Sequence, residues 1–227
     1  MAPYVSGNKA PPRYRDVVDH ALLRAVGPFN DALHAIAPKA YAGSATGRIL
    51  RVHPVLTVPN AITLTSIAVA SVAAALVAWH GERGWWVRPA AGAVFMFAYF
   101  LDLADGNYAR RYRCGTTLGD YLDHGGDLIK WLHMAIALVV ASKAGGLYAY
   151  AAARKPAMAL LGILLLAELH GLACVQKYLP AMGTDAGETL GSLAPLCVCE
   201  PEAGSTALLG VGTLHAVTAL LIATGKL

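Results

Sequence analysis

Apolar stretches of roughly twenty residues, separated by short polar segments, constrain the fold of this chain more than any other feature of its sequence. Five such stretches cover residues 61–79, 89 to beyond 101, 119–142, 156–175 and 206–223. An α-helix needs about 20 apolar residues to cross the hydrocarbon core of a bilayer. Residues 188–199 form a shorter stretch of mixed apolarity, which we count as a sixth span. We therefore expect an all-α integral membrane protein, built as a six-helix transmembrane bundle.

The composition supports a membrane protein and excludes an ordinary soluble enzyme. Apolar and aromatic residues make up 56% of the 227 residues, and charged residues only 14%, whereas a soluble domain carries roughly 25% charged residues. The mean hydropathy of +0.50 also excludes a disordered chain. The net charge of +4 comes from scattered basic residues, so we expect no nucleic-acid polymer as a partner.

The N-terminal part of the chain differs in character from the rest. The sequence divides into a flexible tail (residues 1–13), an amphipathic arm with a linker (14–55) and a membrane domain (56–227). Between Val18 and Ile36, apolar residues recur at a helical spacing of three to four. This pattern predicts an amphipathic helix at the membrane interface, broken at Gly27 and Pro28. It leaves open that the helix packs instead on a partner or on the protein itself.

Four aspartates lie close together in the sequence, in or beside two of the predicted spans: Asp102, Asp105, Asp123 and Asp127. A charged group at the bilayer centre costs about 2.5 to 3.5 kcal/mol, so such residues are functional candidates. Helical spacing puts the first two on one face with Gly106, Ala109 and Arg110, and the last two on one face with Gly119. Because a short basic loop joins the two helices, we expect antiparallel neighbours whose four carboxylates converge.

Crowded carboxylates repel one another unless cations lie among them. A ligand set made only of oxygen atoms suits hard divalent ions, so we expect two bound Mg²⁺ or Mn²⁺ ions. Two-metal centres commonly serve displacement at phosphorus. Small residues beside the carboxylates leave room for a bulky ligand, and Arg110 supplies a cation for a phosphate. The rival interpretation is an ion or proton site in a small transporter.

The segment from Asp102 to Asp127 reads D-L-A-D-G-N-Y-A-R, eight residues, G, three residues, D, three residues, D. It resembles the signature of the CDP-alcohol phosphotransferase family, and Asn60 and Thr63 in VPNAITL resemble that family's P-N-x-x-T motif. The resemblance implies a homodimeric enzyme of phospholipid biosynthesis in which the hydroxyl of a lipid or small-alcohol acceptor attacks a CDP-alcohol donor and CMP leaves.

The resemblance also implies roles for individual residues. Asp102, Asp105 and Asp123 would hold the metal pair, and Asp127 would be both a ligand and the general base. The nucleotide site would comprise Asn60, Thr63, Gly106, Ala109, Arg110 and Gly119. Lys130 follows Asp127 by three residues. It could neutralise Asp127, hold an acceptor phosphate or extend to the membrane interface.

The substrates are predicted from the sequence D-H-G-G-D at residues 123–127. It resembles the choline and ethanolamine phosphotransferases, which implies transfer from CDP-choline or CDP-ethanolamine to diacylglycerol. Those enzymes are much longer than this chain. The alternative is therefore a CDP-diacylglycerol-dependent phosphatidyltransferase that acts on glycerol phosphate, inositol, inositol phosphate or serine.

The orientation follows from the cluster Arg110, Arg111 and Arg113, which we place in the loop between the second and third spans. Basic loops stay in the cytosol, so we expect a multi-pass protein whose active site faces the cytosol. The membrane would be the endoplasmic reticulum or a similar endomembrane in a eukaryote, and the cytoplasmic membrane in a prokaryote.

Overall fold

The computed structural model describes residues 17–43, 57–80, 86–112, 114–143 and 211–224, and the shorter pieces 159, 162–163, 166, 169–170, 173 and 195–197. Within these residues it contains helices and no strand. The helices are α1 (Val17–Gly43), α3 (Val58–His80), α4 (Val87–Arg111), α5 (Thr117–Lys143) and α7 (Val211–Thr224). The all-helical class is confirmed. The predicted tail and most of the predicted spans at 156–175 and 188–199 fall outside the described residues, so the count of six spans is not confirmed.

Two of the described helices are long and apolar enough to cross a membrane. An 18-residue window in Val58–Trp79 of α3 has a mean hydropathy of 2.2, and one in α4 has a mean hydropathy of 1.3. α4 continues to Arg111, so Arg110 and Arg111 belong to its last turn and not to the predicted loop. Cations in that position interact favourably with the C-terminal end of the helix dipole.

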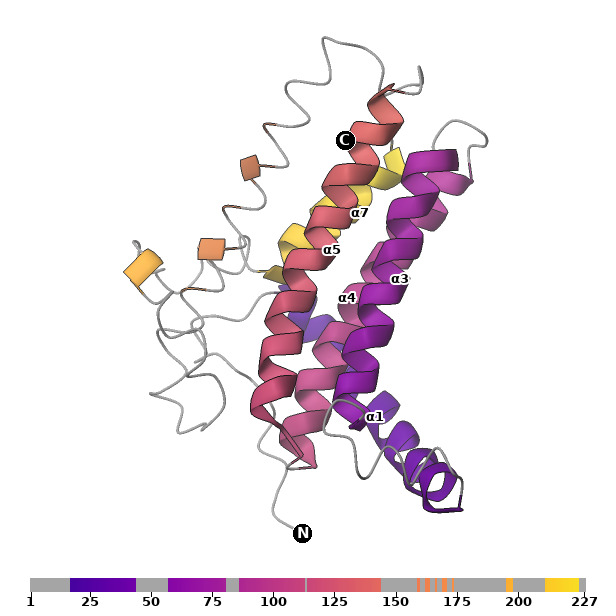
Figure 1. The fold of residues 1–227 in the computed structure, drawn as a ribbon, viewed down its shortest axis with the longest axis vertical. Helices are drawn as coiled ribbons and strands as arrows, with labels where there is room; N and C mark the ends of the chain where they lie inside the picture. Colours follow the sequence, from indigo (N-terminus) through magenta and orange to yellow (C-terminus); the bar gives the residue numbers. More distant parts are fainter. Residues whose placement is uncertain are drawn as a thin grey trace.

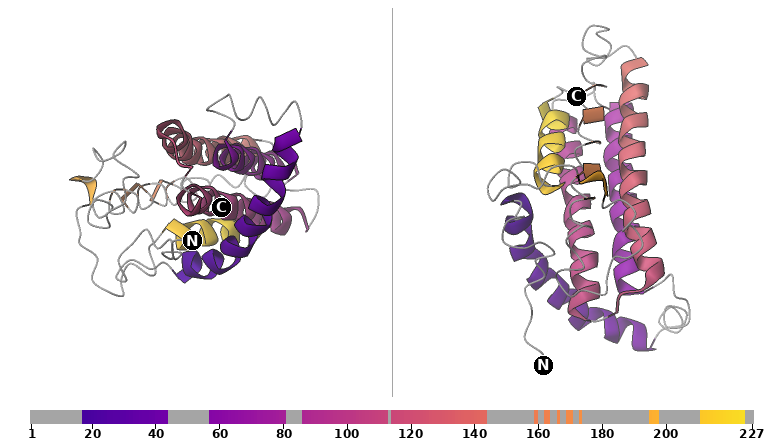
Figure 2. Two further views of the ribbon diagram at one scale, coloured as in Figure 1. Left: turned by 90° about the horizontal axis from the view of Figure 1, so that it is seen from below. Right: turned by 90° about the vertical axis from the view of Figure 1, so that its left-hand side faces the viewer.

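The arrangement of the helices brings the signature residues to one end of the bundle. α3 packs against both α4 and α5, while α4 also packs against α7 and α1. In Figure 1, α4 ends and α5 begins at the lower end of the bundle, where α1 lies. Figure 2 shows α1 crossing this end obliquely and α7 lying beside α4. Asp102, Asp105 and Asp123 are therefore near the same end of the bundle.

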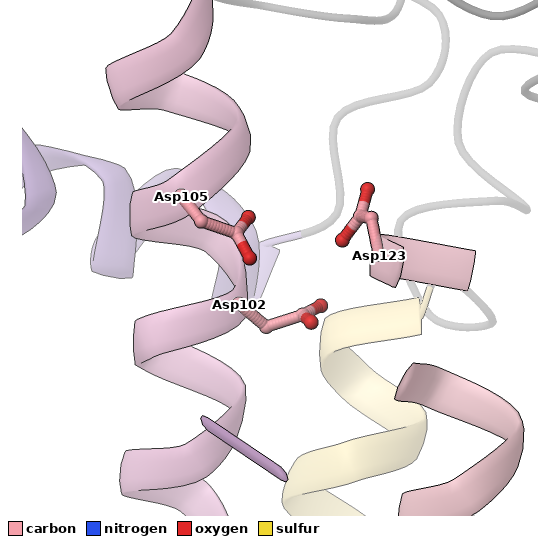
Figure 3. A group of neighbouring side chains, drawn as sticks. All are labelled: Asp102, Asp105 and Asp123. Carbon is pink, nitrogen blue, oxygen red and sulfur yellow. The ribbon is translucent and has the colours of Figure 1, made fainter. Parts of the chain in front are cut away.

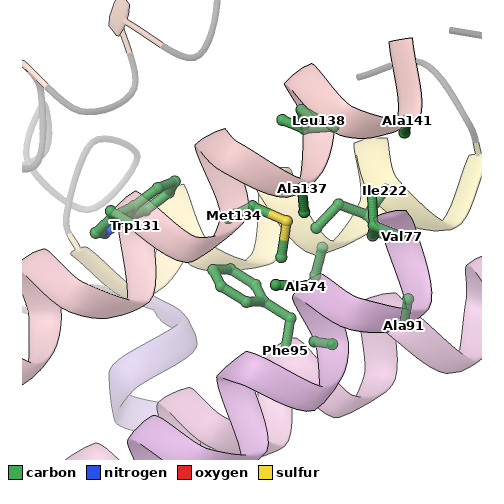
Figure 4. Close-up of a cluster of buried hydrophobic side chains, with 12 residues drawn as sticks. Ala74, Val77, Ala91, Phe95, Trp131, Met134, Ala137, Leu138, Ala141 and Ile222 are labelled. Atoms are coloured by element: carbon green, nitrogen blue, oxygen red, sulfur yellow. The ribbon is translucent and has the colours of Figure 1, made fainter. Parts of the chain in front are cut away.

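A cluster of buried apolar side chains joins α3, α4, α5 and α7 (Figure 4). At its centre, Met134 is fully buried, and Phe95 meets Trp131 edge to face with ring centroids 5.8 Å apart. Aromatic pairs of this kind contribute about 0.5 to 1.5 kcal/mol beyond the burial of their surface. The cluster fixes α5 relative to α4, and α3 packs against both helices.

Close packing of α4 on α7 depends on Gly92. A Cβ atom at this position would lie 2.5 Å from the backbone oxygen of Ala219 and 3.2 Å from the Cβ of Ala223. We expect Gly92→Ala to lower the free energy of unfolding by about 1 to 3 kcal/mol, because α7 must shift. Gly125→Ala is the control, since a Cβ there meets nothing within 4 Å; it should be neutral or stabilising by about 0.5 to 1 kcal/mol. Thermal unfolding of both variants in one detergent measures the difference, and equal stability would contradict the packing.

Helix α1 runs without interruption through Gly27 and Pro28, so the predicted break is wrong. A proline inside a helix removes one hydrogen bond to the residue four positions earlier. Both Pro28 and Arg24, whose carbonyl loses that donor, are exposed. The freed carbonyl lies on the outer side of the helix, and the helix therefore continues past the proline.

The apolar side of α1 packs on the protein itself. Val26 is fully buried in a cluster with Leu101, Ala104 and Tyr108 of α4, and Leu33 of α1 packs against this cluster. The alternative that the sequence pattern left open is thus the one observed for these residues. The predicted position of α1 at the membrane interface is not confirmed.

Candidate functional site

Three of the predicted metal ligands meet between α4 and α5. One oxygen atom each of Asp102, Asp105 and Asp123 lies within 4.8 Å of the other two, and Figure 3 shows the three side chains pointing toward one another. Asp105 is buried, whereas Asp102 and Asp123 are half-buried. Mg²⁺ binds oxygen at 2.0 to 2.1 Å, so opposite ligands lie about 4.2 Å apart. The donor type and the spacing therefore fit one divalent ion after small adjustments.

The fourth predicted ligand, Asp127, lies beside this group and is bound to a lysine. Lys130 Nζ donates to Asp127 Oδ1 at 2.7 Å and to Asp102 Oδ1 at 2.5 Å. The lysine side chain is only 3% exposed, so it does not extend to the interface. Two carboxylates balance its buried charge, as a buried cation requires. Asp127 is thus connected to the three clustered carboxylates through Lys130.

The carboxylate of Asp105 is held on both of its oxygen atoms. Thr63 Oγ1 lies 2.5 Å from Asp105 Oδ2 and 3.1 Å from the carbonyl oxygen of Pro59. The backbone N–H of Gly106 donates to Asp105 Oδ1. Hydrogen bonds to a charged acceptor are strong and fix its orientation. Thr63, predicted for the nucleotide site, therefore orients a predicted metal ligand, a contact that the sequence did not indicate.

Asn60 and Gly119, both predicted for the nucleotide site, are neighbours. Asn60 is buried, and a Cβ atom at Gly119 would lie 2.7 Å from its Oδ1 and 3.1 Å from Thr116 Oγ1. The N–H of Gly119 donates to Thr116 Oγ1 at 2.9 Å. This is the usual bond of a threonine N-cap, and it sets the start of α5. The first turns of α5 therefore bring Gly119 against α3 just before Asp123.

The other three residues predicted for the nucleotide site belong to the last turns of α4. Gly106, Ala109 and Arg110 are half-buried. α4 is a continuous helix through these positions. Helical spacing therefore places the three residues on the same face of α4 as Asp102, as predicted. The segment after α4 returns to this face, since a Cβ atom at Gly115 would lie 3.9 Å from that of Ala109.

Sequence reasoning missed a polar contact between α1 and the signature helix. The buried side chain of Asn30 donates to the carbonyl oxygen of Ala104 at 2.9 Å and to Asn107 Oδ1 at 3.1 Å. His34 Nδ1 lies 2.8 Å from the hydroxyl of Tyr108. Asn107 and Tyr108 lie between Gly106 and Ala109 in the signature. No role was assigned to Asn107 or Tyr108 from the sequence. The available signal was that Asn30 follows Val26 by one turn, on the apolar side of the helix.

Nearer the surface, Asp31 of α1 binds the end of α4. Arg111 Nη2 lies 2.6 Å from Asp31 Oδ1, and the hydroxyl of Tyr112 donates to the same oxygen at 2.7 Å. Burial, together with the hydrogen bond to Asp31 and its negative charge, raises the pKa of Tyr112 above its usual value. Arg111 is thus engaged by α1 on the outside of the bundle.

Comparison with known proteins identifies the family. The family of CDP-alcohol phosphatidyltransferases matches residues 56–222, which is most of the chain. The chain belongs to this family. The members of this family are transferases of substituted phosphate groups that act in phospholipid biosynthesis, and the family depends on a divalent metal. Family membership implies a CDP-alcohol donor and an alcohol acceptor, and with the two apolar helices it indicates a membrane protein. Between the two interpretations of the carboxylates, the enzyme is confirmed over the transporter.

A curated relative from Arabidopsis thaliana is named CDP-diacylglycerol--glycerol-3-phosphate 3-phosphatidyltransferase 2. It is 36% identical to this chain over 69 residues, which are 30% of this chain and 28% of the relative. The aligned part thus spans less than a third of the relative's length. The relative favours the CDP-diacylglycerol-dependent alternative over the predicted transfer from CDP-choline or CDP-ethanolamine. The choline and ethanolamine branch, predicted from D-H-G-G-D, is not confirmed.

Proposed function

We propose that this protein is a CDP-diacylglycerol-dependent phosphatidyltransferase with a small polar acceptor, glycerol phosphate being the first candidate. The observation that carries the proposal is the group of carboxylates Asp102, Asp105 and Asp123, placed by α4 and α5 at one end of the bundle. The activity named for the Arabidopsis relative supports the choice of donor and acceptor. Inositol, inositol phosphate and serine are the other acceptors to compare.

In this proposal Asp102, Asp105 and Asp123 hold Mg²⁺ or Mn²⁺, with Asp127 as a further ligand. The bound ions supply neutralisation of the diphosphate and of the oxygen that leaves with CMP. Thr63 and the N–H of Gly106 hold the Asp105 carboxylate in place before the substrate arrives. A ligand that is already oriented needs no rearrangement during the reaction. The nucleotide binds beside Asn60, Gly106, Ala109, Arg110 and Gly119.

Asp127 serves as the general base. Its side chain is 31% exposed, so an acceptor hydroxyl can reach it. Asp127 takes the hydroxyl proton while the acceptor oxygen forms a bond to the phosphorus that carries diacylglycerol. The bond from that phosphorus to the oxygen of CMP breaks at the same time, and CMP leaves with the bonding electrons. The products are a phosphodiester lipid and CMP.

The proposal is tested by measuring CMP release from purified protein in detergent with Mg²⁺. CDP-diacylglycerol is offered with glycerol 3-phosphate, inositol, inositol phosphate or serine, and CDP-choline and CDP-ethanolamine are offered with diacylglycerol. We expect CMP from CDP-diacylglycerol, with the highest rate for glycerol 3-phosphate. CMP release only from CDP-choline or CDP-ethanolamine would show that the donor is wrong.

The orientation is part of the proposal: a multi-pass protein whose carboxylates face the cytosol. Gly115 lies on the exposed segment between α4 and α5, next to Cys114, whose thiol has a pKa raised by burial. We expect Gly115→Cys to react with an impermeant maleimide only from the cytosolic side. The unmodified chain gives the background from native cysteines. Labelling only from the opposite side would reverse the orientation.

The membrane and the oligomeric state also remain proposals. We propose an endomembrane in a eukaryotic source or the cytoplasmic membrane in a prokaryotic one, and a homodimer as the resemblance implies. Chemical crosslinking in native membranes tests the dimer.

Gly119 offers a test of the nucleotide site. A Cβ atom at this position would collide with Asn60 Oδ1, so Gly119→Ala must displace Asn60 or the start of α5. Strain of about 1 to 3 kcal/mol would weaken binding roughly 5- to 150-fold. We expect that loss when CDP is titrated in the presence of Mg²⁺, with Gly125→Ala in the same helix as the control. Unchanged affinity in a folded Gly119→Ala protein would contradict this placement.

A further inference from the structure

Lys130 occupies a position that is defined by two predicted metal ligands. Its Nζ lies 2.5 Å from Asp102 Oδ1 and 2.7 Å from Asp127 Oδ1, and its side chain is 3% exposed. Both carboxylates come from the signature, one on α4 and one on α5. A single ammonium group therefore joins the two helices at the place where their carboxylates approach each other.

The geometry around Asp102 resembles that of a centre with two cations. In such centres the ions lie about 3.5 to 4 Å apart and often share a ligand. Asp102 belongs to the group with Asp105 and Asp123 and also binds Lys130. An ion bridging Asp102 and Asp127 would lie about 2.1 Å from each carboxylate. That ion and the lysine Nζ would have to occupy nearly the same place.

We propose that Lys130 takes the place of the second cation in the free protein. The inference rests on the proposed metal centre. The free protein then binds one divalent ion at Asp102, Asp105 and Asp123, and a second ion enters only together with the nucleotide.

Charge explains why the nucleotide drives this exchange. With one divalent ion and Lys130 present, the four carboxylates are nearly balanced. The diphosphate of the donor adds negative charge, which favours a further cation. The flexible stem of lysine and its three donors allow Nζ to leave the carboxylates and bind a phosphate oxygen. Lys130 therefore lowers the net negative charge of the nucleotide-free site, and its departure leaves Asp102 and Asp127 to the second ion.

The test is a titration of the full-length protein in detergent with Mn²⁺, in which electron paramagnetic resonance measures free Mn²⁺, with and without CDP. We expect the unmodified protein to bind one ion without CDP and two with it. Lys130→Met should bind two ions without CDP, while Lys130→Arg keeps a cation and should bind one. Leu132→Met, at an exposed position of α5, is the matched control and should behave as the unmodified protein.

Two results would overturn the inference and leave the proposed function standing. The first is two ions bound to the unmodified protein without CDP, and the second is a single ion bound to Lys130→Met without CDP. If Lys130→Met does not fold, Lys130→Gln replaces it. The number of ions bound to the unmodified protein with and without CDP still tests the inference. If no Mn²⁺ binds under any condition, the metal centre and the inference both fail.

Discussion

Replacing Asp105 by asparagine should abolish measurable turnover while the helix bundle stays folded. Asp105 is buried and is held by Thr63 and by the N–H of Gly106. The asparagine oxygen can accept from the N–H of Gly106 while its NH2 group donates to Thr63 Oγ1, whose hydroxyl can donate to the carbonyl oxygen of Pro59. The packing of α3 on α4 therefore survives. The substitution removes the negative charge that binds the ion. Metal ions supply several kcal/mol of transition-state stabilisation, so we expect a rate loss on the order of a thousandfold or more.

The measurement is the rate of CMP release, compared with folding by thermal unfolding in the same detergent. Asp31→Asn is the matched control, because Asp31 is a carboxylate on α1 that pairs with Arg111 outside the metal group. That pair is partly exposed, at 26% of the Arg111 side chain and 50% of the Asp31 side chain. Such pairs near the surface contribute about 0 to 1 kcal/mol, so this variant should keep its activity. Chelation should also stop turnover, and Mg²⁺ or Mn²⁺ should restore it. Full activity after exhaustive chelation would show that the centre does not depend on a metal.

The positions of α3, α4 and α5 were predictable because long apolar stretches in the sequence mark helices directly. The residues at which these helices end were harder to predict. α4 continues past the apolar residues through Asp102 to Arg111, since the backbone hydrogen bonds of a helix do not depend on hydropathy. Lipid-facing and protein-facing apolar sides look alike in a sequence. The packing of α1 on α4 was therefore left open, and the sequence signal for it was a polar residue, Asn30, on the apolar side of the helix.

The same limit applies within the site. Spacing along one helix predicts which residues share a face, and the meeting of Asp102, Asp105 and Asp123 follows from two such faces. Contacts that depend on a third helix cannot be predicted from the spacing along one helix. Thr63 reaches Asp105 because α3 packs against α4, and the sequence gives no measure of that approach. On sequence alone, Lys130 could neutralise Asp127, hold an acceptor phosphate or extend to the interface. Its burial between Asp102 and Asp127 excludes the last of these and agrees with the first.

The roles of Asp127 and Asp102 can be separated by comparing two substitutions. Asp127→Asn keeps an oxygen that can accept from Lys130 but loses the basic group. A general base contributes roughly 10² to 10⁴ in rate, so kcat should fall by that factor. The affinity for a CDP analogue at saturating Mg²⁺ should fall much less. Asp102→Asn should reduce both, because Asp102 belongs to the metal group and also holds Lys130.

Measuring both quantities in both variants tests the assignment. A base must reach the acceptor proton, whereas a ligand need only stay ionised, so loss of the base affects the chemical step and loss of a ligand affects donor binding as well. Asp127 is more exposed than Asp102, at 31% against 13% of the side chain, which agrees with a group that meets the acceptor. Donor affinity that falls as far in Asp127→Asn as in Asp102→Asn would show that Asp127 is chiefly a ligand, and the base would then have to be another residue.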